Sequence, residues 1–151
     1  MLLTELVTLD RIRLPLSARD KRGVLRELSE LLAASAGGDP DEIRTAVEER
    51  ESVLSTGIGF GVAIPHGRAP SVHELAVVCG VTAAPVPFDA VDGEPVRLVF
   101  LIVGPESAAG QHVKVLSRIA RLVRREPVRD ALLAAKDAPE FYAVLADAEA
   151  R

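Results

Sequence analysis

The chain has 151 residues, of which 48% are hydrophobic and 26% are charged. This length and hydrophobic share are typical of one globular domain with its own packed core, so we expect residues 1–151 to form a single domain. The formal net charge of −4 disfavours a nucleic-acid-binding protein, because such proteins are usually basic.

Cysteine content and hydropathy exclude further classes. The single cysteine, Cys79, excludes a disulfide framework and a cysteine-rich zinc site. The longest apolar run, residues 98–103, is far shorter than the roughly 20 residues that cross a bilayer. Residues 1–5 lack the basic region of a secretory signal. We therefore expect a cytoplasmic protein without direct membrane insertion.

The beginning of the chain predicts a short strand and a helix. Residues 11–14 alternate basic and apolar side chains, as a half-buried strand does. Ser17 and Asp20 then stand three residues apart, like a capping box. The apolar stripe that follows has helical spacing and ends near Gly37, which predicts a helix of about four turns.

A second helix is predicted from Pro40, with Asp39 as its N-cap. One face of this helix carries Ile43, Ala46, Val47 and Arg50. Since Arg50 continues an apolar, inward-turned face, we expect its side chain to lean over a site rather than to project into solvent.

The middle of the chain predicts a sheet. Residues 55–61 contain three glycines in a tight loop, and a short apolar strand then leads to a turn at residues 65–67. Residues 75–81 and 96–103 are nearly continuous apolar runs, which is typical of strands covered on both faces. Between them, residues 88–93 predict a short edge piece and a turn.

The last third of the chain predicts helices. A helix from about residue 111 to 125 has an apolar stripe that begins with His112 in the first turn. Pro127 and Pro139 predict the first turns of two short closing helices. Helices on both sides of a small, largely buried sheet indicate an α/β sandwich. Another face of the long helix carries a basic row, which is either a solvated face or a docking patch for an acidic partner: Lys114, Arg118, Arg121 and Arg125.

Two histidines are candidates for chemistry. His66 lies at a bend, where a neutral imidazole can act as a base, a metal ligand or a nucleophile that carries a group. The alternative is a loop histidine without a role. His112 lies at a helix start, where backbone N–H groups and the dipole favour an anion. Its alternative is a core histidine with one hydrogen bond. We interpret His73, in a polar loop, as a surface residue.

Other site types lack their motifs. The glycine loop has Val62 where a dinucleotide-binding motif needs its third glycine, and no Gly-Lys-Ser/Thr sequence is present. No His-x-x-Glu-His or related spacing offers metal ligands, and no Gly-x-Ser-x-Gly elbow indicates a serine hydrolase. We therefore expect neither a metal site nor a cofactor.

Two segments resemble a known family. Arg50-Glu51 followed by STGIGFGVAIPHGR at residues 55–68 closely resembles the active-site block of type-2 enzyme IIA domains of the bacterial phosphoenolpyruvate-dependent sugar phosphotransferase system, fructose/mannitol class. PFDAVDGEPVRLVF at residues 87–100 and the helix-opening His112 are similar to the same family, and the likeness spans essentially the whole chain. The resemblance implies a small mixed β-sheet flanked by helices. The FDAVDG and PHGR stretches are most similar to the nitrogen-regulatory branch.

The resemblance also implies residue roles. His66 would accept the phosphate, His112 would hydrogen-bond near the phosphoryl group, and Arg50 would supply positive charge. Phe60 departs from relatives that carry a polar or acidic residue beside the active histidine. Further phosphate contacts would come from the glycine loop, at Thr56, Gly59 and Gly61.

The implied activity is phosphoryl transfer through a phosphohistidine rather than conversion of a small molecule. The expected donor is an HPr-like phosphocarrier, and no cofactor is needed. In the nitrogen-regulatory interpretation, phosphorylation of His66 alters binding to regulatory target proteins. In the alternative, a sugar-transport IIA component passes the phosphate to a IIB domain. A third hypothesis is a ligand-binding domain without covalent chemistry.

Overall fold

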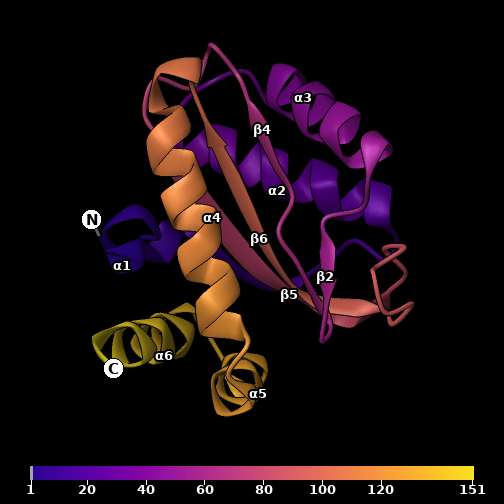
Figure 1. Ribbon diagram of the computed structural model, residues 1–151, viewed down its shortest axis with the longest axis vertical. Coiled ribbons are helices and arrows are strands. Elements are labelled where there is room, and N and C mark those ends of the chain that lie inside the picture. Colours follow the sequence, from indigo (N-terminus) through magenta and orange to yellow (C-terminus); the bar gives the residue numbers. More distant parts are fainter. Residues whose placement is uncertain (1) are drawn as a thin grey trace.

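A mixed β-sheet forms the centre of the computed structural model, which describes residues 2–151 (Figure 1). Its strand order is β1-β5-β6-β3-β2, and β4 also pairs with β6. The pairs β5–β6 and β2–β3 are antiparallel, and the other pairs are parallel. The strands are β1 (Ile12–Leu16), β2 (Gly57–Gly59), β3 (Val62–Ala63), β4 (His66–Arg68), β5 (Ala76–Val86) and β6 (Val96–Gly104).

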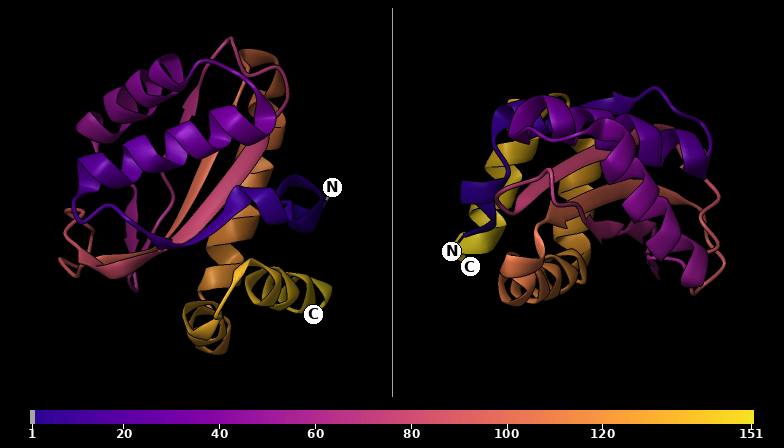
Figure 2. Two further views of the ribbon diagram at one scale, coloured as in Figure 1. Left: turned by 180° about the vertical axis from the view of Figure 1, so that it is seen from behind. Right: turned by 90° about the horizontal axis from the view of Figure 1, so that it is seen from above.

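Helices cover both faces of this sheet (Figure 2). One face is covered by α2 (Lys21–Ala36) and α3 (Pro40–Val53), and the other by α1 (Leu3–Leu6), α4 (Ala109–Val123), α5 (Glu126–Ala134) and α6 (Ala138–Ala150). Two 3-10 turns, η1 (Leu9–Arg11) and η2 (Glu106–Ala108), precede β1 and α4. The prediction of a mixed sheet flanked by helices is confirmed.

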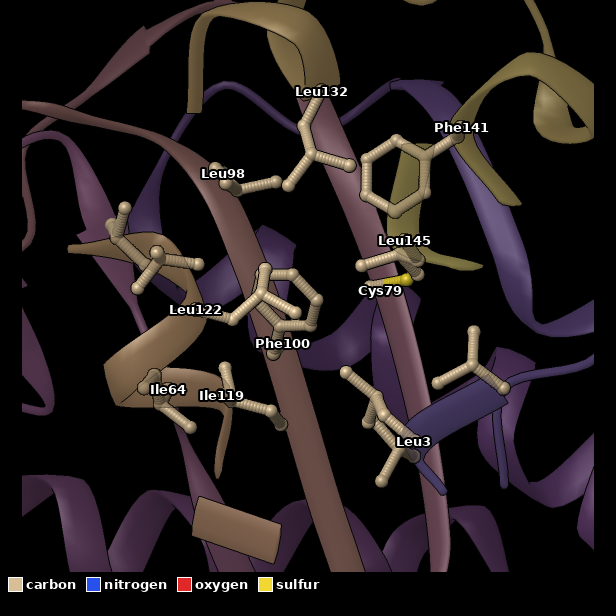
Figure 3. Close-up of a cluster of buried hydrophobic side chains, with 14 of the residues drawn as sticks. Leu3, Ile64, Cys79, Leu98, Phe100, Ile119, Leu122, Leu132, Phe141 and Leu145 are labelled. Carbon is tan, nitrogen blue, oxygen red and sulfur yellow. The ribbon is translucent and has the colours of Figure 1, made fainter. Parts of the chain in front are cut away.

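The two central strands are almost entirely apolar because each face of the sheet has its own core. Successive side chains of a strand point to opposite faces. Cys79 and Phe100 therefore pack on the side of α4, α5 and α6 (Figure 3), whereas Val78 and Leu101 pack against α2 and α3. Burial raises the pKa of the Cys79 thiol, so this cysteine is an unreactive part of the core.

Side-chain caps fix the starts of the two helices that precede the glycine loop. Asp39 caps α3 and Pro40 lies in its first turn, as the sequence predicts. α2 differs from the prediction, because its N-cap is Asp20 and not Ser17. The Asp20 carboxylate accepts a hydrogen bond of 2.7 Å from the Gly23 amide, whereas the Ser17 amide donates to the side chain of Glu27.

The expected turn at residues 65–67 is instead the start of strand β4. His66 pairs in parallel with Ile102 of β6, and Gly67 pairs with Val103. β3 and β4 both pair with β6, and the pairing is interrupted between them because Pro65 has no N–H group. The Pro65 carbonyl still accepts a hydrogen bond of 3.1 Å from Ile102. Pairing with β6 therefore holds the backbone of His66 within the sheet.

The predicted edge piece at residues 88–93 is a loop and contains no strand. Side chains bond its backbone in place of a neighbouring strand: the Phe88 carbonyl accepts hydrogen bonds from the hydroxyl of Ser55 at 2.6 Å and from the ammonium of Lys21 at 3.2 Å. A turn closes the loop, where the Gly93 amide donates to the Ala90 carbonyl. The loop is thereby fastened to α2 and to the glycine segment.

Candidate active site

His66 is an ordered, half-buried imidazole at the first position of β4. Its Nδ1 atom lies 3.0 Å from the carbonyl oxygen of Ile64. Because a carbonyl oxygen can only accept a hydrogen bond, this contact assigns the ring proton to Nδ1 and the lone pair to Nε2. The nitrogen of His66 that is free to act as a nucleophile is therefore Nε2.

His112 lies beside His66. The ring centroids are 5.3 Å apart and the ring planes make an angle of 71°. The side chain lies on the inner face of α4 and is 6% exposed. Burial lowers the pKa of His112 to about 4, and the charges of His66 and Arg68 act in the same direction. His112 is therefore a neutral imidazole at pH 7.

The start of α4 has fewer free amides than the sequence suggests. His112 is the fourth residue of this helix, and the 3-10 turn η2 runs directly into it. The Ala109 amide, at this junction, donates to the Glu106 carbonyl. Since such amides are what a helix start offers to an anion, His112 contributes to the site through its ring rather than through its backbone.

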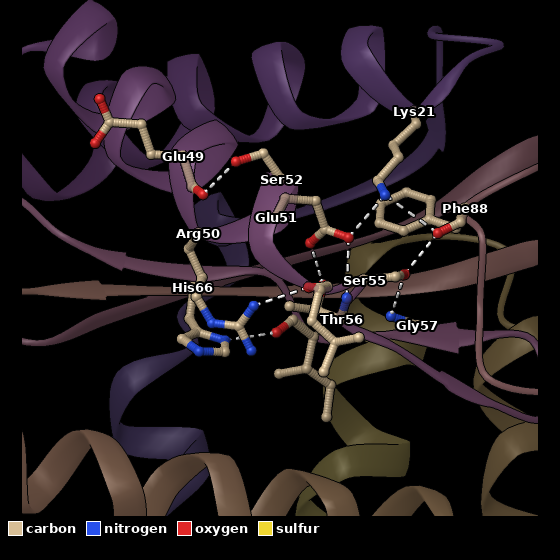
Figure 4. A network of polar contacts seen from close by, with 12 residues as sticks. Lys21, Glu49, Arg50, Glu51, Ser52, Ser55, Thr56, Gly57, His66 and Phe88 are labelled. Carbon is tan, nitrogen blue, oxygen red and sulfur yellow. Dashed lines mark hydrogen bonds and ion pairs between the residues drawn. The ribbon is translucent and has the colours of Figure 1, made fainter.

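Arg50 enters the site from the last turn of α3. Its Nη1 atom donates a hydrogen bond of 2.8 Å to the Leu54 carbonyl, and the side chain extends toward the His66 ring (Figure 4). A guanidinium group has five N–H donors, so this single contact orders Arg50 and leaves donors for a ligand.

Arg68 belongs to the electrostatics of the site, although the sequence predicts no role for it. Its charge helps to lower the pKa of His112. Its Nη1 atom also forms an ion pair of 2.8 Å with Glu106. The signal that identifies Arg68 is its spacing, because residues two apart on a strand share a face, and Arg68 follows His66 at that distance.

A chain of hydrogen bonds connects His66 to the buried carboxylate of Glu51 (Figure 4). Glu51 accepts hydrogen bonds from the amide of Thr56, at 2.9 Å, and from its hydroxyl. The Thr56 carbonyl accepts from the amide of Ile64 at 3.0 Å, and the Ile64 carbonyl accepts from His66. The Lys21 ammonium, 2.8 Å from Glu51, compensates the buried charge. Both donors of Thr56 are thus occupied, and Thr56 fixes the segment that orients His66.

The glycine loop forms the tip of the β2–β3 hairpin. The tip consists of Gly59, Phe60 and Gly61, and all three have positive φ angles, of 95°, 60° and 76°. Asp92 holds the tip, because its carboxylate accepts a hydrogen bond of 3.1 Å from the Phe60 amide. Positive φ is unusual for phenylalanine, so the hairpin geometry is stabilised by contacts from the loop at residues 88–93.

The hairpin tip is distant from His66. Val62, next to the tip, pairs with Leu98 of β6, whereas His66 pairs with Ile102. Four residues of extended strand span about 13 Å. The structure therefore does not bring Gly59 or Gly61 to the histidine pair. Phe60, at the same tip, also lies away from His66, whereas the resemblance implies a position beside that histidine.

Among residues 2–151, no three His, Cys, Asp or Glu side chains gather where they could hold a metal ion. Within the same residues, no helix is both long enough and apolar enough to cross a membrane. His73 is exposed, as its polar surroundings predict.

The sequence matches a known family over nearly its whole length. The profile described as "Phosphoenolpyruvate-dependent sugar phosphotransferase system, EIIA 2" matches residues 5–148. The chain is 37% identical over 146 residues to a nitrogen regulatory protein of Bradyrhizobium diazoefficiens, covering 97% of this chain and 95% of the relative. It is 38% identical over 137 residues to the fructose-specific EIIABC component of Bacillus subtilis, covering 90% of this chain but 22% of that longer protein.

Solved structures show the same fold. The nitrogen regulatory protein IIA-Ntr of Neisseria meningitidis superposes with a TM-score of 0.89 at 35% identity, covering 95% of this chain and 98% of that protein. The mannitol enzyme IIA of Escherichia coli, in its complex with phosphorylated enzyme IIB, superposes with a TM-score of 0.80 at 24% identity. That match covers 94% of this chain and 99% of the mannitol protein, and it concerns the fold alone.

Proposed function

Because this chain belongs to the EIIA 2 family of the phosphoenolpyruvate-dependent sugar phosphotransferase system, we propose that it is a cytoplasmic histidine phosphocarrier of the nitrogen-regulatory type. His66 accepts a phosphoryl group from an HPr-like protein. The observation that carries the proposal is the histidine pair, in which the free Nε2 of an ordered His66 is accompanied by a neutral imidazole at 5.3 Å.

The transfer needs no net movement of protons. Nε2 of His66 forms a bond to phosphorus while the bond between phosphorus and the donor histidine breaks, and the donor imidazole leaves with that electron pair. His66 keeps its Nδ1 proton, and the Ile64 carbonyl stabilises the positive charge that develops on the ring. Such a transition state is loose, so positioning and charge stabilisation contribute more than acid–base chemistry.

The surrounding residues stabilise the phosphoryl oxygens. Arg50 offers the N–H groups that its contact with Leu54 leaves free, and neutral His112 offers one ring N–H. Arg68 adds positive charge, which Glu106 partly offsets. Thr56 acts as a positioning residue through Ile64, rather than as a phosphate ligand.

We place regulation ahead of sugar transport because nitrogen regulatory proteins match this chain at 37% identity in sequence and at 35% identity in a solved structure with a TM-score of 0.89. A separate fructose-specific EIIA component of Haloferax volcanii, covered to a similar extent, is 33% identical. Phosphorylation adds a charge of about −1.5 to −2 at pH 7. Two exposed apolar side chains lie next to site residues: Leu54, 69% exposed, whose carbonyl binds Arg50, and Val113, 62% exposed, which follows His112. A charge change among such groups alters which partner surface can dock. The alternative function is transfer from His66 to a IIB domain.

The proposal is tested by phosphorylation with a radiolabelled HPr-like donor. The protein should acquire an acid-labile, base-stable label, and His66→Ala should abolish it. His73→Ala is the matched control, because His73 is an exposed histidine outside the site, and it should be labelled fully. Full labelling of His66→Ala would refute the assignment.

A second step separates the two roles. The labelled protein is mixed with a IIB domain and, separately, with candidate regulatory proteins. Rapid discharge to the IIB domain supports the transport alternative. Retention of the label, together with a target whose affinity differs between the phosphorylated and free forms, supports regulation.

A further inference from the structure

A strongly basic hollow lies between the C-terminal half of α4 and the end of α6. Figure 1 shows the two helices near each other at this end of α4. Its volume is about 420 Å³, and its charged lining consists of Arg118, Arg121, Arg125, Arg151 and Glu149. At about 1.5 Å of rise per residue, Arg118 and Arg121 lie roughly 9 and 14 Å along the helix from His112, and Arg125 lies beyond the end of α4. The hollow therefore shares no residue with the phosphoryl site.

The concentration of positive charge in this hollow does not follow from the composition of the chain, whose net charge is −4. Arg118 and Arg121 stand at positions i and i+3 of α4, so they lie on one face of the helix, and Arg125 follows the end of α4 as the N-cap residue of α5. Like charges at such spacing destabilise a helix. The repulsion would be relieved by a ligand with several negative charges.

Existing contacts order these arginines without exhausting their donors. Arg125 donates a hydrogen bond of 2.7 Å to the Ala148 carbonyl, Arg118 lies 3.3 Å from Glu149, and Arg151 lies 2.9 Å from Asp147. The Arg121 side chain forms neither a hydrogen bond nor an ion pair with any residue from 2 to 151. Each guanidinium has five N–H donors, so most of them are available.

The one carboxylate in the lining, Glu149, mainly binds the N-terminal segment. Glu149 accepts hydrogen bonds from the amides of Leu3 and Thr4 and from the Thr4 hydroxyl, in addition to Arg118. These bonds lower the pKa of Glu149 even though its burial acts in the opposite direction. Glu149 therefore stays ionised and fastens the N-terminal segment to α6, and it neutralises at most one of the four arginines.

We propose that this hollow binds a small anion with two or more phosphate groups, of the size of pyrophosphate or a nucleoside diphosphate. Guanidinium groups bind phosphate oxygens in pairs, so several of them around one hollow match several phosphate oxygens. The volume lies within the range of about 300–1,000 Å³ of small-molecule sites, and Leu122 and Ala148 add apolar lining. A concave site of this size fits a small ligand better than the surface of an acidic protein.

Isothermal titration of the whole chain with pyrophosphate and with ADP, at low and at physiological salt, tests the proposal. Arg121→Glu should weaken binding at least tenfold. The matched control is Arg19→Glu, which makes the same charge change at an exposed arginine outside the hollow. Binding that is undetectable at millimolar ligand, unchanged in Arg121→Glu, or weakened equally by both variants overturns the proposal.

Nuclear magnetic resonance locates the ligand and distinguishes this site from the phosphoryl site. Amide shifts upon addition of pyrophosphate should be centred on residues 118–125 and 147–151, and they should persist in His66→Ala. Shifts centred on His66, or their loss in His66→Ala, contradict the proposal. So does an acidic peptide that binds in an Arg121-dependent manner when pyrophosphate and ADP do not, because the hollow would then be a protein-docking surface.

Discussion

The imidazoles of His66 and His112 meet edge to face with their centroids 5.3 Å apart, although one belongs to a strand and the other to a helix. The pairing of His66 with Ile102 fixes the first ring, and burial of the inner face of α4 fixes the second. A positive charge on His66 lowers the pKa of His112, so the pair does not carry two charges near neutral pH. A negatively charged phosphoryl group on His66 would have the opposite effect.

His112→Ala should slow phosphorylation of His66 on the order of 100-fold without abolishing it, because one hydrogen-bond donor to the phosphoryl oxygens is lost while the nucleophile stays. Single-turnover labelling from the phosphorylated donor measures the rate. His112→Gln retains an N–H donor and should recover part of the loss. A rate unchanged in His112→Ala would show that His112 has no part in the transfer.

The stability of the unphosphorylated protein should fall between pH 6.5 and pH 4 because of His112. The unfolded chain binds a proton to this histidine near pH 6.5, whereas the folded state binds it only near pH 4. The contribution of His112 to the free energy of unfolding is thus fully present above pH 6.5, decreases as the pH falls from 6.5 to 4, and does not change further below pH 4. The loss is on the order of 3 kcal/mol.

Urea denaturation of the wild type and of His112→Gln across this pH range isolates the contribution, since glutamine does not titrate. The difference in unfolding free energy between the two proteins should change with pH only between about pH 4 and pH 6.5. Parallel curves for the two proteins would mean that His112 titrates alike in the folded and unfolded states.

Local patterns in the sequence predict much of the fold. Asp39-Pro40 marks the start of α3, and the apolar runs at residues 75–81 and 96–103 identify the two central strands, because caps and burial act over a few neighbouring residues. The histidines could be selected for the same reason: one follows a proline at a chain bend and the other begins an apolar helical stripe.

Long-range register could not be predicted in this way. The pairing of Val62 with Leu98 of β6 places the hairpin tip about 13 Å from His66, and no local pattern encodes that pairing. The hydrogen bond between Thr56 and Glu51 could not be predicted either. The direction of the Glu51 side chain depends on contacts of α3 with Lys21 and with the glycine segment. The strand register and the Glu51–Thr56 bond both join segments that only the folded chain brings into contact.

Glu51→Gln should lower the unfolding free energy by about 1–3 kcal/mol and should slow phosphorylation of His66. Glutamine leaves the Lys21 ammonium without its buried counter-charge and weakens the bonds to Thr56, so the segment that carries Ile64 becomes less ordered. Urea denaturation and single-turnover labelling measure the two effects.

Glu49→Gln is the control for Glu51→Gln, since Glu49 lies on the same helix with an exposed side chain. It should leave both the stability and the rate of labelling unchanged. A Glu51→Gln protein with reduced stability but a normal labelling rate would contradict the link between the carboxylate and the orientation of His66.

Gly57→Ala should destabilise the protein by about 1–3 kcal/mol, because an added Cβ would overlap the neighbouring loop. That Cβ would lie 2.7 Å from the Cβ atom and 2.9 Å from the Cα atom of Ala90. The glycine thus permits a close approach of two backbones, which the Val91 amide stabilises by donating to the Gly57 carbonyl.

Gly110→Ala is the control, because a Cβ added at Gly110 would have no atom within 4 Å. This substitution should instead raise the stability by about 0.5–1 kcal/mol in urea denaturation. Equal effects of the two substitutions would contradict tight packing at Gly57.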